Sequence, residues 1–233
     1  MPPFGQWARY ARRVDMLLNS KEKLLLIDTC GETAGIALSV GQRVVAAEDL
    51  TRGNASAEIV GAVRRLLEQV GWRLAELDAI GVVSGPGSFT GMRVGLATAK
   101  GLCEAAGLPL TAVSRLEVLA DAATMDDCLV ALDAGRGELY VRDGSSGRDW
   151  LTSSDELEAI RAGRPIVVAE TRVAERLRAC APIVWLLCVS DSLRVVMQHL
   201  HTGDDMSLVD ANYVREESDI YRRPASASIT GTP

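Results

Sequence analysis

The stretch from Ser84 to Leu102 reads SGPGSFTGMRVGLATAKGL and sets the fold of the residues around it. The apolar run 79–83 leads into it and predicts a buried strand, which Gly85-Pro86-Gly87 ends. Ser88 and Thr90 are both N-cap candidates for a following helix that starts between 89 and 91. We therefore expect strand, tight turn and helix, a shape that directs a helix N-terminus and its free N–H groups at one spot.

The segments around this stretch predict alternating strands and helices. Before it we expect strands at 24–28, 35–40 and 44–50 and an amphipathic helix at 57–70; after it, a strand at 110–113 and a helix from the capping box at Ser114 to about 123. A second series follows, with strands at 129–133, 138–142, 165–169 and 183–189, a capping box at 153–156, and helices near 173–178 and 191–201. The endings Leu-Ile-Asp28 and Ala-Leu-Asp133 suggest an internal duplication.

The composition is that of a globular chain with an acidic balance. Of 233 residues, 48% are hydrophobic and 24% charged, the formal net charge is −6, and aromatic residues make up only 4%. These values argue against a chain that binds nucleic acid by itself, because such binding needs clustered Lys and Arg or aromatic side chains on which bases stack. We therefore expect any contact with nucleic acid to go through partners.

The termini and the cysteines carry further expectations about processing and location. Residues 1–22 have no secretory signal and are expected to be an N-terminal extension, with Met16 as an alternative start that would leave 1–15 untranslated. The five cysteines form no C-x-x-C pair and are expected to be reduced core residues. The longest apolar run, 181–189, is too short for a membrane helix, which needs ~20 residues. We expect a cytoplasmic protein without membrane contact.

Two halves that each begin with a strand ending in Asp resemble the actin-like (sugar-kinase/Hsp70, ASKHA) α/β fold. The phrase GPGSFTGMRVG at 85–95, with LLLIDT near the start and LDAGRGELY at 132–140, resembles the TsaB (YeaZ) family over roughly 24–219. The resemblance implies a first lobe at 23–123, a reduced second lobe at 124–190, and a C-terminal helix and segment at 191–221 returning to the first lobe. From Arg222 the composition turns to Pro, Ser, Ala, Thr and Gly, so we expect a disordered tail at 222–233.

Membership of that family implies a part in making threonylcarbamoyladenosine beside the anticodon of tRNAs that read A-starting codons. The resemblance implies a non-catalytic scaffold that forms a heterodimer with the paralogue TsaD, which performs the transfer, and works with a TsaE-like ATPase. No cofactor is implied for this chain, with ATP entering at most through the complex. A homodimer through the same helices is the alternative pairing when TsaD is absent.

The helix after the glycine turn indicates where a partner would bind. Its charges, Arg93, Lys100 and Glu104, form one narrow stripe, so the helix needs cover on two sides, from the core and either the other lobe or a partner. The motif loop comprises Gly85, Pro86, Gly87, Ser88, Phe89, Thr90, Gly91 and Arg93. The expected partner interface comprises Ile59, Val63, Leu66, Met92, Val94, Gly95, Thr98, Ala99 and Leu102.

A second hypothesis is a free-standing ATP-binding phosphotransferase of the same fold. Asp28, Thr29, Asp133 and Gly135 would then hold the nucleotide, although a structural role for both aspartates is favoured. The stretch has no Walker lysine before Lys100. The two histidines, His199 and His201, have the wrong spacing for a metal pair on one helix face, so no metal site and no catalytic residue are expected.

Overall fold

The computed structural model describes residues 21–51, 53–125 and 127–200, and its first half is built on a five-stranded sheet. The spatial order is β3-β2-β1-β4-β5, with β1 antiparallel to β2 and parallel to β4. The strands are β1 (Lys23–Asp28), β2 (Ala34–Val40), β3 (Arg43–Leu50), β4 (Ala79–Val83) and β5 (Leu110–Val113). The central strands β1 and β4 are buried throughout their apolar residues, as expected of strands covered on both faces.

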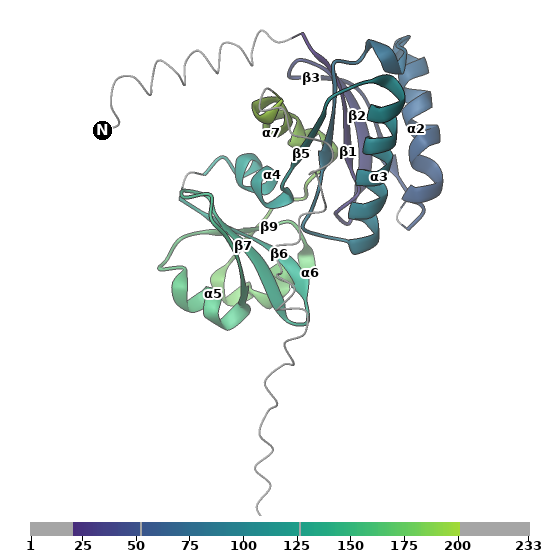
Figure 1. Cartoon of the computed structure of the whole chain (residues 1–233). Helices are drawn as coiled ribbons and strands as arrows, with labels where there is room; N and C mark the ends of the chain where they lie inside the picture. The colour runs from purple at the N-terminus through teal and green to yellow at the C-terminus, as the bar shows by residue number, and fades with distance from the viewer. Residues whose placement is uncertain (1–20, 52, 126, 201–233) are drawn as a thin grey trace, which may run out of the picture.

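Helices cover both faces of this first sheet (Figure 1). The long helices α2 (Ala55–Val70) and α3 (Phe89–Ala106) lie side by side on the outer face, and the short 3-10 helix η1 (Leu74–Glu76) follows α2. Both long helices end in a left-handed glycine, Gly71 and Gly107, where positive φ is required. The other face is covered by α7 (Ser192–His199), which packs so closely on β4 that a Cβ on Gly81 would meet Val196 at 2.6 Å.

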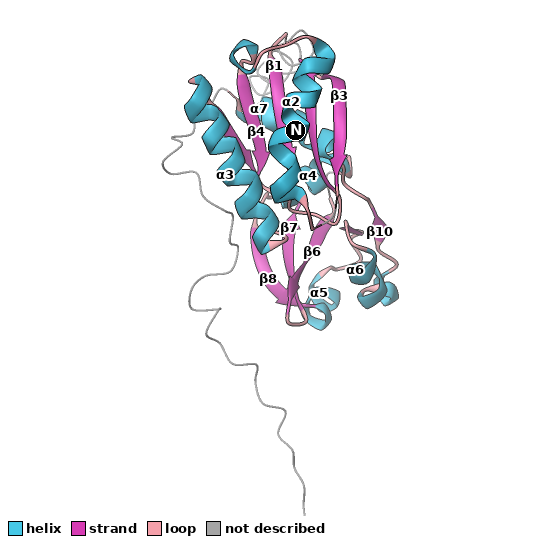
Figure 2. Cartoon of the chain, turned by 90° about the vertical axis from the view of Figure 1, so that its right-hand side faces the viewer, coloured by secondary structure: helices cyan, strands magenta, loops and turns pink. Residues whose placement is uncertain are grey.

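The second half repeats the first in topology (Figure 2). Its sheet has the order β10-β9-β6-β7-β8, in which β6 is antiparallel to β7 and parallel to β9. The strands are β6 (Leu129–Gly135), β7 (Glu138–Asp143), β8 (Asp149–Ser153), β9 (Ile166–Val168) and β10 (Ile183–Val184). The helices are α5 (Ser154–Ile160), α6 (Thr171–Arg176), and the 3-10 turns η2 (Arg178–Cys180) and η3 (Val189–Asp191). Read from β8, the strand order matches that of the first sheet, which confirms the duplication.

The two halves exchange their last helices. The helix α4 (Arg115–Ala122) follows the last strand of the first sheet but packs on β6, β7 and β9 of the second. The helix α7 follows the last strand of the second sheet and packs on β5, β4 and β1 of the first. Residues from both halves therefore share one hydrophobic core, while a smaller cluster of buried residues lies within the second half.

Most expected elements are confirmed, with four corrections. The strand β8 was missed, and the predicted strand at 183–189 is only two residues long. Ser153 and Glu156 form the second capping box as expected. Ser114 makes no capping hydrogen bond, so the first box is wrong; Glu117 instead pairs with His199, Nε2 to Oε1 2.8 Å. Cys188 is exposed rather than buried.

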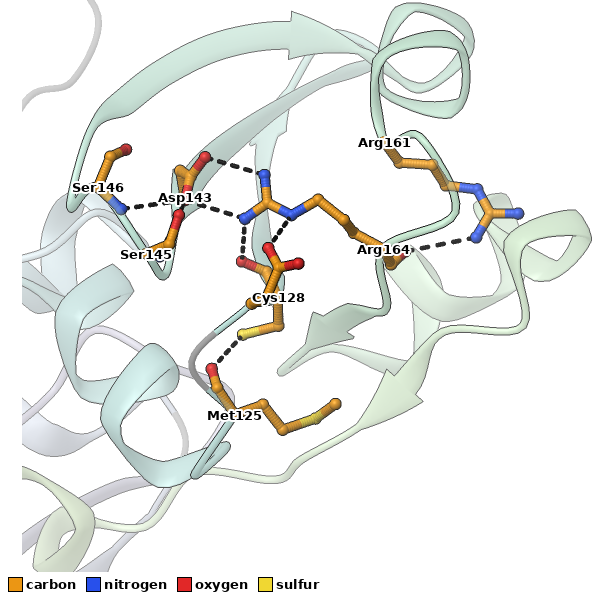
Figure 3. Close-up of polar contacts among 8 residues, drawn as sticks. Met125, Cys128, Asp143, Ser145, Ser146, Arg161 and Arg164 are labelled. Atoms are coloured by element: carbon orange, nitrogen blue, oxygen red, sulfur yellow. Dashed lines mark hydrogen bonds and ion pairs between the residues drawn. The ribbon is translucent and has the colours of Figure 1, made fainter. Parts of the chain in front are cut away.

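Arg164 joins three segments beside the start of β6 in the second sheet (Figure 3). The two terminal nitrogens of Arg164 each lie 2.9 Å from an oxygen of Asp143, and Nη2 also donates to the carbonyl of Cys128. Hydrogen bonds from Arg164, and then from Ser145, hold the pKa of Asp143 well below its ordinary value. The contact thus ties the start of β6, the end of β7 and the loop before β9 at neutral pH, and it weakens as acid protonates Asp143.

Part of the expected organisation falls outside the structure. The predicted tail, most of the N-terminal extension, and His201 lie outside the described residues. Over the ranges that the structure describes, none of the helices is long and apolar enough to cross a membrane.

Candidate functional site

The motif loop packs against the turn after β1 rather than standing open. Ser88 caps α3 by accepting a hydrogen bond from the Gly91 N–H at 3.2 Å, and its own N–H donates to the carbonyl of Cys30 at 2.8 Å. The Thr29 hydroxyl donates to the carbonyl of Gly91 at 2.6 Å. Two backbone N–H groups at this helix start, those of Ser88 and Gly91, are thus engaged by the chain itself.

The spacing of the motif glycines follows from this contact. A Cβ on Gly87 would lie 2.3 Å from the Cys30 carbonyl oxygen, and one on Gly91 would lie 1.9 Å from the Thr29 carbonyl oxygen. On the next turn, a Cβ on Gly95 would lie 2.4 Å from Oγ1 of Thr29. Only glycine allows the helix to approach the turn this closely, so the motif is required by packing.

We predict that Gly91→Ala destabilises the protein by at least ~2 kcal/mol, because the clash is with rigid backbone. The matched control is Gly101→Ala in the same helix, where nothing lies within 4 Å of the added Cβ. There we expect a gain of about 0.5–1 kcal/mol from helix propensity. Urea unfolding of both variants measures the difference; equal stabilities would show that the close approach does not constrain the fold.

A cleft of about 500 Å³ lies between the two halves. The ends of β1 and β6 face it together with the N-terminal turns of α2 and α3, and its walls include Thr29, Ser88, Asp133 and Gly135. Of the four residues proposed for a nucleotide, the cleft thus brings together Thr29, Asp133 and Gly135. Asp28 lies behind them, buried, with Oδ1 accepting a hydrogen bond from the Cys30 N–H at 2.8 Å.

Arginines already pair with the carboxylates around this cleft. Asp133 contacts Arg176 through Oδ1 at 3.0 Å and Arg172 through Oδ2 at 3.1 Å. Burial raises the pKa of Asp28, against the opposing effects of Arg115 and the Cys30 N–H. Burial, followed by the charge of Asp28, also raises the pKa of the Cys30 thiol, which makes it a poor nucleophile at neutral pH.

A buried ion pair crosses between the halves. Nη1 of Arg115, at the start of α4, lies 2.7 Å from Oε1 of Glu170, which follows β9, and both side chains are 5% exposed or less. Glu170 also accepts a hydrogen bond from the Asp133 N–H at 3.3 Å. The Arg115 N–H donates to the carbonyl of Gly85 in the motif loop. One arginine thus links the motif loop, the second sheet and the cleft wall.

Removing one partner of this pair leaves a buried charge without its counterion. We predict that Glu170→Gln lowers the free energy of unfolding by roughly 3 kcal/mol. The exposed pair of Arg194 with Asp121 supplies the control, and Asp121→Asn should cost at most about 1 kcal/mol. Denaturant titration at pH 7 tests both; a Glu170→Gln variant as stable as Asp121→Asn would contradict the linking role of the pair.

The structure corrects most of the expected partner interface. The side chains of Ile59, Val63, Leu66, Met92 and Ala99 are buried in the core of this chain, and Gly95 is buried against Thr29. A partner cannot contact them in the folded state. Val94, Thr98 and Leu102 are half-buried and stay predictions for a partner surface.

Two exposed apolar side chains on the same helix pair lie outside the expected interface set. Val60 on α2 is 60% exposed and Phe89 at the start of α3 is 55% exposed. The Arg93 guanidinium lies over the Phe89 ring at 3.9 Å from its centroid. The apolar periodicity of α2 gives no signal for Val60, because on the helix it lies only about 20° from the buried Leu67.

Within residues 21–51, 53–125 and 127–200, no three His, Cys, Asp or Glu side chains are grouped as a metal site would require. His199 is paired with Glu117 on the far side of the first sheet, away from the cleft. The arrangement consists of a cleft where Asp133 and Glu170 are paired with arginines, and an outer helix pair with the exposed Val60 and Phe89.

Two sheets of the same topology, joined by exchanged helices around a cleft, define the actin-like α/β fold. Solved structures share it: YeaZ from Pseudomonas aeruginosa, with a TM-score of 0.68 and 24% identity over 82% of this chain and 99% of that chain. A protein described as uncharacterized with similarity to peptidase YeaZ from the same organism has a TM-score of 0.67 and 27% identity over 83% and 100%. These matches cover both halves.

Sequence comparisons indicate which family of this fold the chain resembles. Residues 49–158 match the family model "TsaD: tRNA N6-adenosine threonylcarbamoyltransferase". The tRNA threonylcarbamoyladenosine biosynthesis protein TsaB of Escherichia coli is 32% identical over 64% of this chain and 65% of its own length, and that of Bacillus subtilis is 40% identical over 51% and 53%. The matches thus span between about half and just under two thirds of these relatives. These comparisons support the TsaB (YeaZ) family as the one that this chain resembles.

Proposed function

We propose that this protein is an accessory subunit in the synthesis of threonylcarbamoyladenosine in tRNA. The observation that carries the proposal is the similarity to curated TsaB proteins, whose names give that pathway. In this proposal the chain performs no chemistry itself. It supports a TsaD-like paralogue that carries out the transfer, with a TsaE-like ATPase, in the cytoplasm.

The outer face of α2 and α3 is the proposed surface for the paralogue. Its candidate residues are the exposed Val60 and Phe89 and the half-buried Val94, Thr98 and Leu102, of which Val94 also lines the cleft. Exposed aromatic side chains are enriched at the energetic centres of protein interfaces, and Arg93 holds the Phe89 ring in place. A transferase of the TsaD type from Agrobacterium fabrum is 46% identical to this chain over 101 residues, which supports pairing between related folds.

The acidity of the chain supports a division of labour in the proposed complex. A net charge of −6 gives no sequence-independent attraction to phosphates, so the partners would supply the contacts to tRNA. A homodimer through the same helix face is the alternative assembly in the absence of the paralogue.

We predict that Val60→Asp and Phe89→Asp each weaken capture of the TsaD-like paralogue at least tenfold, about 1.4 kcal/mol, because each places a charge in the proposed interface. The matched control is Ile160→Asp on α5, which changes a side chain that is 53% exposed in the second half. Co-purification and calorimetric titration with the paralogue provide the measurement. Wild-type binding by both helix variants would reject this face; failure of the unaltered protein to bind would reject the proposed function.

The phosphotransferase hypothesis keeps one observation in its favour, because the cleft gathers Thr29, Asp133 and Gly135. A metal-bound nucleotide would have to displace Arg172 and Arg176 from Asp133. We therefore predict that the isolated chain binds Mg-ATP with a Kd weaker than about 1 mM. Calorimetry on the full chain tests this; micromolar binding that Asp133→Asn abolishes would favour the phosphotransferase instead.

A further inference from the structure

An exposed apolar segment begins at β10, which Figure 2 shows at the outer edge of the second half. We call Ile183, Val184, Trp185 and Leu186 the apolar ribbon; each is between 40% and 67% exposed. Single exposed apolar side chains are ordinary on a protein surface, whereas a contiguous run of them is typical of a surface that takes part in association.

Within the part of the chain that the structure describes, three of the four sheet edges are protected against further pairing, and that of β10 is not. β3 carries three charged side chains and β8 carries Asp149, and charge is a common protection of an edge strand. β5 is uncharged but buried, with α7 packed against it. The ribbon is both exposed and uncharged, and the sequence has no charged residue between Arg178 and Asp191.

The backbone of the ribbon directs hydrogen-bonding groups outward. β10 is parallel to β9, and the Trp185 N–H extends this pairing by donating to the Val168 carbonyl at 2.8 Å. Trp185 therefore faces β9. Neighbouring residues of a strand direct their N–H and C=O groups to opposite sides, so Val184 and Leu186 direct theirs away from the sheet. Two alternate residues with outward backbone groups are what an added strand pairs with.

A second copy of the ribbon fits these groups in an antiparallel register. Val184 of one copy then lies opposite Leu186 of the other, and each such pair exchanges two hydrogen bonds. The two-fold axis passes between the two Trp185 residues, which form the closer, non-hydrogen-bonded pair, where the side chains can pack on each other. The same segment thus supplies both sides of the contact, as in an isologous interface.

The charges around the ribbon favour the antiparallel direction. A net charge of −6 opposes self-association in general, so two copies need an uncharged surface on which to meet. The helix α6, which packs beside β10, carries Glu175 and two arginines that are already paired with Asp133. Arg178 precedes the ribbon and Asp191 follows it. Antiparallel pairing brings the basic end of one copy toward the acidic end of the other, whereas parallel pairing would bring like charges together.

We propose that this protein self-associates through the apolar ribbon, with the β10 strands of two copies paired antiparallel about Trp185. The second sheets of the two copies would then form one continuous sheet. A standard interface buries ~800 Å² per partner, which four side chains are too few to supply, so we expect weak, concentration-dependent association. The ribbon is a different surface from the outer face of α2 and α3, so self-association through it is independent of the proposed function.

Sedimentation of the full-length chain over a range of concentrations tests the proposal. The average mass should rise with concentration toward that of a dimer, and Leu186→Asp, at the most exposed ribbon position, should raise the dissociation constant at least about tenfold. The matched control is Ile160→Asp on α5, 53% exposed and outside the ribbon, which should leave the constant unchanged. A chain that stays monomeric at every concentration would overturn the proposal, as would a dimer that Val60→Asp abolishes and Leu186→Asp does not.

A charge exchange at the two-fold axis separates this pairing from a general loss of folding. Because Trp185 meets its own copy, Trp185→Asp and Trp185→Lys should each weaken self-association at least about tenfold, since each places like charges opposite one another. An equimolar mixture of the two variants should associate again, because opposite charges then meet. Folded variants that stay monomeric in the mixture would overturn the pairing about Trp185.

Hydrogen exchange supplies a readout on the unaltered protein. The amides of Val184 and Leu186 should become protected as the concentration rises, because the second copy then accepts their hydrogen bonds. Protection of the same amides in the monomer would assign the edge to another part of the same chain and overturn the proposal. Protection that appears only after the paralogue is added would overturn it in favour of a partner strand.

Discussion

The close approach of α3 to the turn after β1 constrains the rest of the first half. Gly87 just before the helix, and Gly91 and Gly95 within it, leave room for the carbonyls of Cys30 and Thr29 and for the Thr29 hydroxyl, and a side chain at any of these positions would collide with that turn. The approach fixes where α3 crosses the sheet, and therefore which of its faces meets the core. It also positions Gly85 of the motif loop, whose carbonyl accepts a hydrogen bond from the backbone N–H of Arg115. The buried ion pair with Glu170 then joins the first half to the second.

The exchange of α4 and α7 explains why the two halves share a core. Each sheet is covered on its inner face by a helix that belongs to the other half in sequence, so neither sheet buries its apolar surface alone. The second half has the smaller core of its own, with strands of three and two residues at β9 and β10. Such a lobe depends on the contacts it makes with α4 and on the ion pair at its cleft end.

Local patterns were enough to predict the strands and helices of the first half, because its apolar runs are long and bounded by glycine or proline. They failed at β8, where the sequence DWLTS mixes charge and apolarity and gives only a short signal. They also extended the last strand through 189, since a continuous apolar run does not show where pairing with a neighbour stops. That limit comes from tertiary contacts with β9, which the sequence does not contain.

The residues expected at the partner interface show why apolar character alone is a poor guide to an exposed surface. α3 is apolar around most of its circumference, and the choice of Met92, Gly95 and Ala99 selected residues that the core itself needs. Which side faces outward is set by the glycine contact with Thr29, a constraint between residues far apart in sequence. Val60 and Phe89 become visible as surface residues only once the helices are placed on the sheet.

In the cleft, too, tertiary contacts determine the properties of residues that the sequence singles out. The aspartates at the ends of β1 and β6 stand where the duplicated fold places them, yet the local charges determine what they can do. Asp133 is matched by two arginines, and Asp28 is sealed behind the turn with a pKa raised by burial. Arg115 and Glu170 connect the two halves through a protein ion pair at the position where the cleft walls meet. Ion pairs within the chain thus engage Asp133 and Glu170 at the cleft without a ligand, and a rigid first half would let the outer helix pair present a fixed surface to the proposed partner.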